Sequence, residues 1–360
     1  MKGYVVHETS NSSARDDWAQ DSASRRPERA ADLVRLRLDL GYDGTDFFGW
    51  AMQPGLRTVQ GELERALGVL LRSPDKRVAV TVGGRTGTGG HARGQVAHLD
   101  VTPQQLARWA GQITDPRLLP TLRARRINGI IKRTAPDLVV HEVTEVPDEF
   151  EARYSAIKRR YEYRLRGLGV RRDPLSRATT ADVPHELDFA EMQRAATSMV
   201  GLRDFTSFCK AREGATAVRN LLEFSWREDP DGVLVARIEA DAFCHSMVRS
   251  LVGAVVSVGT GRIDVAELDR LLEARERPNR FAVMPPHGLS LEEITYPPHH
   301  EVAERAALTR ARRAAIPPQA PAELREIAAA GREEEGCGPD PAENPTELAS
   351  GARSGDTPTL

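Results

Sequence analysis

The chain has 360 residues, of which 40% are hydrophobic and 28% are charged, as in an ordinary globular protein with a sizeable core. No apolar run reaches the roughly 20 residues that cross a bilayer, and the N-terminus lacks the apolar segment of a secretion signal, so we expect a cytoplasmic protein without a membrane anchor. The three cysteines show no C-x-x-C spacing, which predicts reduced thiols and no zinc or other metal site.

The formal net charge of −2 hides an uneven distribution of charge along the chain. Residues 298–360 hold seven Arg against eleven Asp or Glu, so this segment carries −4 and the remainder carries +2. Between Glu151 and Arg177, nine Lys or Arg stand against three acids, a cluster that suits RNA phosphates. From charge alone, a solvent-exposed helix or hairpin face explains such a run better than RNA binding does.

Both ends of the chain are poor in apolar residues. Residues 1–32 show no sustained hydrophobic period, and residues 298–360 become rich in Ala, Glu, Arg and Pro, so both are expected to be mostly disordered. Within the second segment, Val302–Ala315 has the composition of a short surface helix. The sequence therefore divides into four parts: 1–32, 33–148, 149–297 and 298–360.

The first half begins with a strand pattern, because apolar and polar residues alternate over Val34–Leu40. Apolar residues recur at helical spacing over Val59–Leu71, with Thr58 available as a cap, and predict a helix. Val78–Val82 and Gln95–Val101 are strand-like runs on either side of a glycine-rich loop. The loop is therefore expected to join strand to strand.

The second half repeats this mixture of strands and helices. Arg160–Arg166 alternates as a strand, and Phe189–Val200 has helical spacing. Val233–Ile238 predicts another strand, and Ala242–Gly259 another helix. Strands interleaved with helices in both halves predict the α+β class, with antiparallel or mixed sheets rather than a doubly wound parallel sheet.

The glycine-rich loop belongs to the most informative stretch, residues 83–98, which reads G-G-R-T-G-T-G-G-H-A-R-G-Q-V-A-H. The other motif blocks are Y-D-G-T at 42–45 with T-V-Q-G-E-L-E at 58–64, S-A at 155–156 with R-R-Y-E-Y at 159–163, D-F-T-S-F at 204–208, A-F-C-H-S-M-V-R at 242–249 and P-P-H-G-L at 285–289. In this order, the six blocks resemble the tRNA pseudouridine synthase A family. Together they are far more specific than any single short motif.

The resemblance implies a fold of two similar halves, flanked by helices, around a central RNA-binding cleft. It also implies a homodimer that binds the anticodon stem-loop of tRNA and converts uridine to pseudouridine without a cofactor. The reaction breaks the N-glycosidic bond and rejoins the base through carbon, so the target nucleotide must first leave the helix.

Gly87 stands where the family has its nucleophilic aspartate. Glycine has no side chain, so it can neither attack the nucleotide nor take a proton. Arg85 matches the family arginine that helps to position the nucleotide, and Arg249 matches the arginine that pairs with the aspartate. Without that carboxylate, a buried Arg249 needs water or phosphate as its partner. Outside the resemblance, a surface salt bridge explains either arginine more simply.

Four further residues are expected to bind the substrate. Tyr161 matches the family tyrosine that contacts the flipped base, although a half-buried strand tyrosine explains it without the resemblance. His91 matches a loop histidine that holds the loop or touches RNA. Lys158 and Arg160, in the basic run, are expected to contact RNA.

Three hypotheses about function remain open. The chain is an active synthase with a substitute carboxylate, for which Asp43, Asp100 and Asp241 are weak candidates, or it is a tRNA-binding or tRNA-folding protein that has lost its nucleophile. A dinucleotide-binding oxidoreductase is a remote alternative, because Gly87–Ala92 fits G-x-G-x-x-A. Such a fingerprint should open a helix and precede an acid by about 20 residues, and this loop leads into a strand.

Overall fold

The computed structural model describes residues 32–75, 77–112, 115–210, 216–275 and 281–310. These belong to one compact unit, and a second unit, Ala315–Leu360, lies outside them. The disorder predicted for the N-terminal segment and for most of the tail also falls outside the described residues. The boundary between the halves at residue 148 stays a prediction. None of the described helices is long and apolar enough to cross a membrane.

The described unit is built on a 10-stranded sheet with the main order β4-β1-β3-β10-β5-β9-β8-β7, in which β2 also pairs with β3 and β6 with β5. Neighbouring strands are antiparallel except in the pairs β3–β10 and β5–β6. This mixed sheet confirms the predicted α+β class. The strands are β1 (Val34–Tyr42), β2 (Thr81–Val82), β3 (His91–Val101), β4 (Leu138–Glu145), β5 (Lys158–Arg166), β6 (Ala181–Asp182), β7 (Gly201–Asp204), β8 (Val218–Glu228), β9 (Leu234–Ala240) and β10 (Leu289–Thr295).

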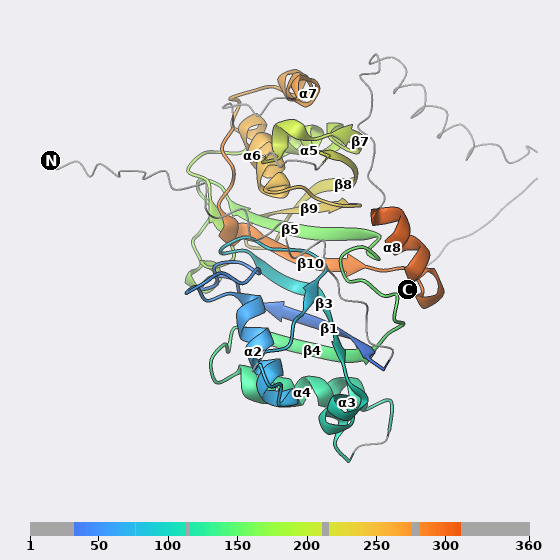
Figure 1. The fold of residues 1–360 in the computed structure, drawn as a ribbon. Helices are drawn as coiled ribbons and strands as arrows, with labels where there is room; N and C mark the ends of the chain where they lie inside the picture. Colours follow the sequence, from blue (N-terminus) through green and yellow to red (C-terminus); the bar gives the residue numbers. More distant parts are fainter. Residues whose placement is uncertain (1–31, 76, 113–114, 211–215, 276–280, 311–360) are drawn as a thin grey trace, which may run out of the picture. The chain divides into compact units, whose positions relative to one another are not determined.

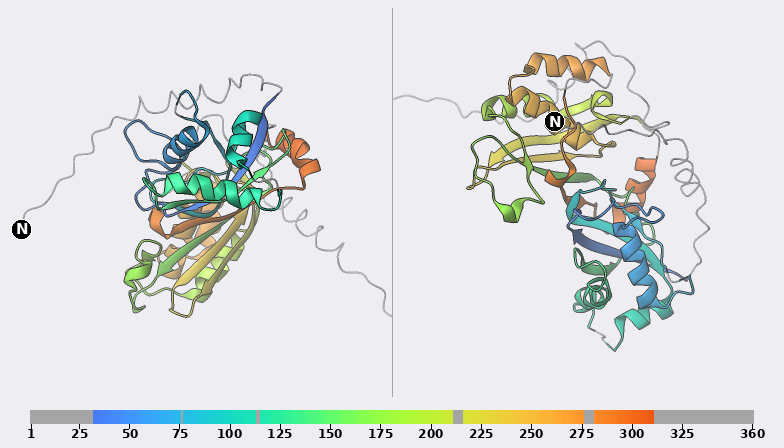
Figure 2. Two further views of the ribbon diagram at one scale, coloured as in Figure 1. Left: turned by 90° about the horizontal axis from the view of Figure 1, so that it is seen from below. Right: turned by 90° about the vertical axis from the view of Figure 1, so that its left-hand side faces the viewer.

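Helices α2 to α7 gather at the two ends of this sheet, and α8 lies beside its middle, near β5 and β10 (Figures 1 and 2). Helices α2, α3 and α4 lie at the end formed by β1 and β4, and α5, α6 and α7 lie at the end formed by β7, β8 and β9. Strand β10 comes late in the chain and inserts between β3 and β5, so the two halves share one sheet. The helices are α2 (Val59–Leu71), α3 (Pro103–Ala110), α4 (Leu119–Ile131), α5 (Phe189–Ser198), α6 (Met247–Gly259), α7 (Val265–Ala274) and α8 (Val302–Arg310).

Several elements match the sequence patterns closely. Helix α2 has the predicted bounds, and the Thr58 hydroxyl accepts a hydrogen bond from Gly61 N at 3.2 Å, as an N-cap should. Helix α6 begins at Met247, five residues later than the apolar pattern suggested. The reason lies at Ser246, whose φ of 66° is left-handed and cannot continue a helix in either direction.

Candidate active site

The loop Gly83–Gly90 connects β2 to β3 and is held by buried side chains near its start. The Gln95 side chain is fully buried and binds Gly84 twice: its nitrogen donates to Gly84 O at 2.6 Å, and its oxygen accepts from Gly84 N at 3.3 Å. The Tyr42 hydroxyl lies 2.8 Å from Thr86 Oγ1 and accepts from Gln95 Nε2 at 3.1 Å. Strands β1 and β3 thus set the position of the loop.

The segment after β1 supports the rest of the loop. Trp50 N donates to Thr86 O at 3.1 Å, and Gly89 N donates to a carbonyl oxygen of the same segment at 3.2 Å. Gly44 lies so close that an added Cβ would be 2.0 Å from Gly90 O. The Y-D-G-T block therefore has a structural purpose, because only glycine at position 44 admits the loop.

Gly87 lies exposed between these anchored residues. An added Cβ at this position would meet no atom within 4 Å. The backbone of Gly87 is outside the left-handed region, so another L-residue fits there without strain. The loop thus presents an open position for a side chain at residue 87, and the match of this position to the family's aspartate stays a prediction.

Arg249 lies in the first turn of α6 and is partly buried. Its Nε donates to Met284 O, and Met284 N donates to Arg249 O at 3.2 Å. Burial lowers the pKa of Arg249, and the nearby Tyr163 opposes this shift. Within the described parts of the chain, no carboxylate forms an ion pair with this guanidinium. Arg249 is therefore a partly desolvated cation that favours an anionic partner.

The segment Met284–Pro286 connects Arg249 to the loop. Pro285 O accepts a hydrogen bond from the Tyr163 hydroxyl at 2.8 Å. Pro286 touches the loop, since an added Cβ at Gly89 would lie 3.1 Å from its Cγ. This short segment thus contacts the arginine of the second half and the glycine loop of the first.

Tyr161 approaches the loop from β5. Its side chain is buried and packs edge-on against Phe243, with the ring centroids 5.0 Å apart. An added Cβ at Gly84 would lie 3.8 Å from the Tyr161 hydroxyl. Burial raises the pKa of Tyr161 and the charge of Arg159 opposes the shift, so the hydroxyl stays protonated at neutral pH.

Arg159 has a structural role that sequence reasoning missed. Its guanidinium donates to Asp241 O at 2.9 Å, to Gly83 O at 3.1 Å and to Arg153 O at 2.9 Å. These carbonyls belong to the connection before α6, to the glycine loop and to the segment before β5. The spacing to Tyr161 in R-R-Y-E-Y was the available clue, because residues two apart on a strand share a face.

Comparisons with known proteins agree with this arrangement of motifs. Residues 195–297 match the family model described as tRNA pseudouridine synthase. The tRNA pseudouridine synthase A of Leifsonia xyli subsp. xyli is 50% identical over 279 residues, which cover 77% of this chain and 96% of that protein. The tRNA pseudouridine synthase A of Cutibacterium acnes is 46% identical over 283 residues, covering 78% and 95%. This chain belongs to the tRNA pseudouridine synthase A family.

The family membership confirms the resemblance inferred from the six motif blocks. A chain of the crystal structure of a Cbf5-Nop10-Gar1 complex is also similar, over 71% of this chain and 58% of that one. At 10% identity and a TM-score of 0.29, this likeness carries no argument about the present chain.

Strand β5 separates the residues predicted to bind the family's substrate. Because side chains alternate along a strand, Tyr161 faces one side of the sheet, and Lys158 and Arg160 face the other. Lys158 Nζ donates to Glu239 at 2.7 Å, and Arg160 donates to Glu293 at 3.1 Å. Both cations are thus paired on the far face from Tyr161, and their contact with RNA stays a prediction.

His91 joins three segments around the loop. Its Nδ1 accepts from Gly44 N at 2.9 Å, and its Nε2 lies 2.8 Å from Ala178 O and 3.1 Å from His287 O. Because both carbonyl oxygens can only accept, Nε2 carries a hydrogen, and Nδ1 also lies 3.1 Å from Asp43 Oδ1. The arrangement is the one expected of a residue that holds the loop, and direct contact with RNA stays a prediction.

Arg85 is exposed on the loop, two residues before Gly87. Its role in positioning a nucleotide stays a prediction.

The aspartates considered as substitutes for the nucleophile have other partners. Asp43 accepts hydrogen bonds from Thr45 Oγ1 at 2.6 Å and Thr45 N at 3.0 Å. Asp100 forms a bidentate pair with Arg35 at 2.7 and 2.8 Å. Asp241 accepts a hydrogen bond from the backbone at the start of β8, at 3.1 Å. Each of these carboxylates is thus engaged in supporting the fold.

A cavity of about 490 Å³ adjoins His91 at the ends of β1 and β5. Asp43, Glu162 and Arg164 contribute charges of both signs to its wall. In the part of the chain that the structure describes, no three potential ligand side chains gather as a metal would require.

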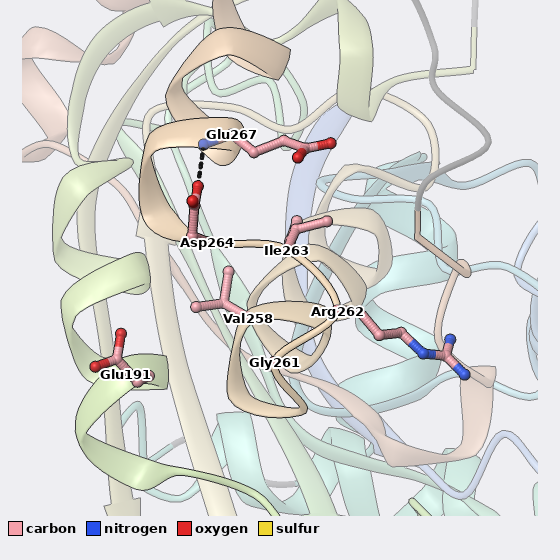
Figure 3. A pocket seen from close by; sticks show the side chains of 7 residues that line it. All are labelled: Glu191, Val258, Gly261, Arg262, Ile263, Asp264 and Glu267. Atoms are coloured by element: carbon pink, nitrogen blue, oxygen red, sulfur yellow. Dashed lines mark hydrogen bonds between the residues drawn. The ribbon is translucent and has the colours of Figure 1, made fainter.

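A second cavity, of about 400 Å³, lies where α5 meets the junction of α6 and α7 (Figure 3). Its wall includes Glu191, Asp264 and Glu267, and Asp264 accepts from Glu267 N at 2.7 Å as the cap of α7. The residues that line this cavity include none of the glycine loop, so we assign it no role in the site.

The expectation of reduced thiols is wrong for two of the three cysteines. Cys209 and Cys244 form a disulfide, with their Cα atoms 5.7 Å apart. They are separated by 35 residues, and only the packing of the segment before β8 against the connection before α6 brings them together. Cys337 lies outside the described residues.

Proposed function

We propose that this chain binds tRNA at the anticodon stem-loop and that its isomerase activity is impaired or absent. One observation carries the proposal: the loop is held in place on both sides of position 87, and position 87 itself is open and has no side chain. The family's reaction begins with a carboxylate at this place, and glycine supplies neither a nucleophile nor a proton acceptor.

The remaining residues support RNA binding without catalysis. Arg249 is a partly desolvated cation without a described carboxylate partner, and an RNA phosphate satisfies such a group. Tyr161 offers a buried aromatic ring beside the loop, where a flipped base is expected to stack. Arg85 is an exposed residue of the same loop.

The activity is tested by the pseudouridine content of unmodified tRNA after incubation with the purified protein, measured by nucleoside chromatography. We expect no product from the unaltered chain and product from Gly87→Asp, because the added side chain enters open space. Gly87→Asn is the matched control, since it has nearly the same shape but no carboxylate, and it should stay inactive. Pseudouridine from the unaltered chain would contradict the proposal.

Binding is tested separately from catalysis. The unaltered chain should bind the anticodon stem-loop more tightly than an arbitrary RNA of equal length at matched salt. Equal affinities would contradict a role as a tRNA-binding or tRNA-folding protein. We further propose a homodimer in the cytoplasm, where its tRNA partner is found, and the mass of the protein in solution tests the dimer.

A further inference from the structure

The connection between β5 and β6, residues 167–180, displays positive charge and apolar side chains to solvent. We call it the arginine loop. Leu175 is 90% exposed and Leu168 is 60% exposed. Arg171, Arg172 and Arg177 are also exposed. A single exposed leucine is common on a protein surface, and the feature of this connection is that two exposed leucines and three exposed arginines share it.

Short-range hydrogen bonds fix the backbone turn that carries Leu175. The turn η1 (Pro174–Ser176) is capped by Asp173, whose Oδ1 accepts from Leu175 N at 2.9 Å. Ser176 N donates to Asp173 O at 3.2 Å, and Arg177 Nη1 donates to Pro174 O at 3.0 Å. The loop therefore presents its leucine on a defined turn.

The arginine loop stands beside the glycine loop. Ala178 O lies 2.8 Å from Nε2 of His91, which is four residues after Gly87. Thr179 lines the same cavity as His91. The arginine loop thus contacts His91, the residue that directly follows the glycine loop.

Two of its arginines are available to a polyanion. Arg172 forms an ion pair with Asp182. No carboxylate of the described residues pairs with Arg171 or Arg177. The loop therefore carries positive charge that its own neighbours leave uncompensated, and phosphates complement it.

We propose that the arginine loop binds the tRNA strand that flanks the target uridine. Arg171 and Arg177 contact phosphates, and Leu175 packs against the base that loses its stacking partner when the target nucleotide leaves the helix. Apolar side chains serve other nucleic-acid-binding proteins as wedges between bases, and covering an unstacked base face reduces the cost of extrusion. The inference rests on the proposed tRNA binding.

The test is the affinity of the full chain for a fluorescently labelled anticodon stem-loop over a series of salt concentrations. The double variant Arg171→Gln, Arg177→Gln should bind more weakly, and the slope of log K against log salt should become shallower by about 1.5, for two lost phosphate contacts. The control is Arg125→Gln, an exposed arginine on α4, which should leave the slope unchanged.

Leu175→Ala should weaken binding about five-fold without changing the salt slope, because it removes apolar contact and no charge. It should also reduce the fluorescence of 2-aminopurine placed beside the target uridine, which reports unstacking. Leu118→Ala is the matched control, since Leu118 is 54% exposed away from the site.

The outcomes separate this inference from the proposed function. If the unaltered chain binds the stem-loop tightly and the variants bind equally well, the inference fails and tRNA binding stands. If Leu175→Ala changes the mass of the protein in solution, the leucine is a contact between protomers and the inference is overturned. If the unaltered chain shows no preference for the stem-loop, both fail.

Discussion

The glycine loop and the arginine loop lie side by side and are held in different ways. The glycine loop depends on groups far away in the sequence, such as Tyr42, Gln95 and Arg159. The arginine loop takes its shape mainly from hydrogen bonds among its own residues, such as those of Asp173 and Ser176. The first is fixed by tertiary structure, and the second by local turn chemistry.

This difference explains why position 87 can carry a glycine while the loop around it keeps its shape. The supports of the glycine loop act on the residues around Gly87, and none of them uses a side chain at that position. The residue at position 87 can therefore change while the hydrogen bonds and contacts that hold the glycine loop, which we call its frame, persist. Changes to the frame should destabilise the protein, whereas changes at position 87 or in the arginine loop should not.

The largest effect is expected from Gly44→Ala. Its added Cβ would lie 2.0 Å from Gly90 O, so the backbone must shift, which should lower the free energy of unfolding by about 3 kcal/mol. Gly87→Ala is the control, because its Cβ meets open space, and it should raise the free energy of unfolding by about 0.5 kcal/mol. Urea unfolding measures both free energies of unfolding. Equal changes for Gly44→Ala and Gly87→Ala would refute the difference expected between the two positions.

Gln95→Leu should have the next largest effect. The backbone N–H and the carbonyl oxygen of Gly84 both lose their hydrogen bond to this side chain. The free energy of unfolding should therefore fall by about 2 kcal/mol. Gln104→Leu, at an exposed position of α3, should change it by less than about 0.5 kcal/mol. A Gln95→Leu protein as stable as the parent would show that the loop does not depend on this side chain.

Changes in the arginine loop should leave stability almost untouched. Arg171→Gln and Leu175→Ala remove exposed side chains, so each should alter the free energy of unfolding by less than about 0.5 kcal/mol. Thermal unfolding checks this expectation. A loss as large as that of Gln95→Leu would mean that the arginine loop is part of the frame.

The smallest expected effect is on the stability of the fold at acidic pH. Burial by itself would raise the pKa of Asp43, but hydrogen bonds from Thr45 and the nearby His91 outweigh it, and the net pKa lies below the ordinary value of 3.8. Because its pKa is lower in the folded than in the unfolded state, the Asp43 carboxylate stabilises the fold above the unfolded pKa. This contribution is lost as the pH falls through the folded pKa. Asp43→Asn should therefore lose less stability than the parent between about pH 5 and about pH 2.

The control for this measurement is Asp46→Asn, a change at an exposed neighbouring position. It should follow the parent through the same acid titration of stability. If the stability of Asp43→Asn also falls with pH as that of the parent does, the carboxylate of Asp43 makes no net contribution to the frame of the glycine loop.

Some elements with a clear local pattern were found from the sequence, but α3 was not found although Thr102 and Gln105 form a capping box at its start. Helix α2 has a cap and regular apolar spacing, and β1 alternates. Helix α4 went unnoticed because no side chain caps its start. Strand β10 went unnoticed because a register shift between Leu291 and Glu293 breaks its alternation. Local patterns predict local structure only where the chain keeps them.

The same limit applies to the site. The motif blocks by themselves determined the family, and the strand and helix patterns gave the α+β class, because these depend on residue identity and order; the loss of a catalytic carboxylate at Gly87 stays a prediction. Only the tertiary structure placed Arg159 across three segments and put Lys158 and Arg160 on the opposite face of the sheet from Tyr161. Which side chains meet is decided by strand pairing between distant parts of the chain, and no spacing along the sequence contains that information.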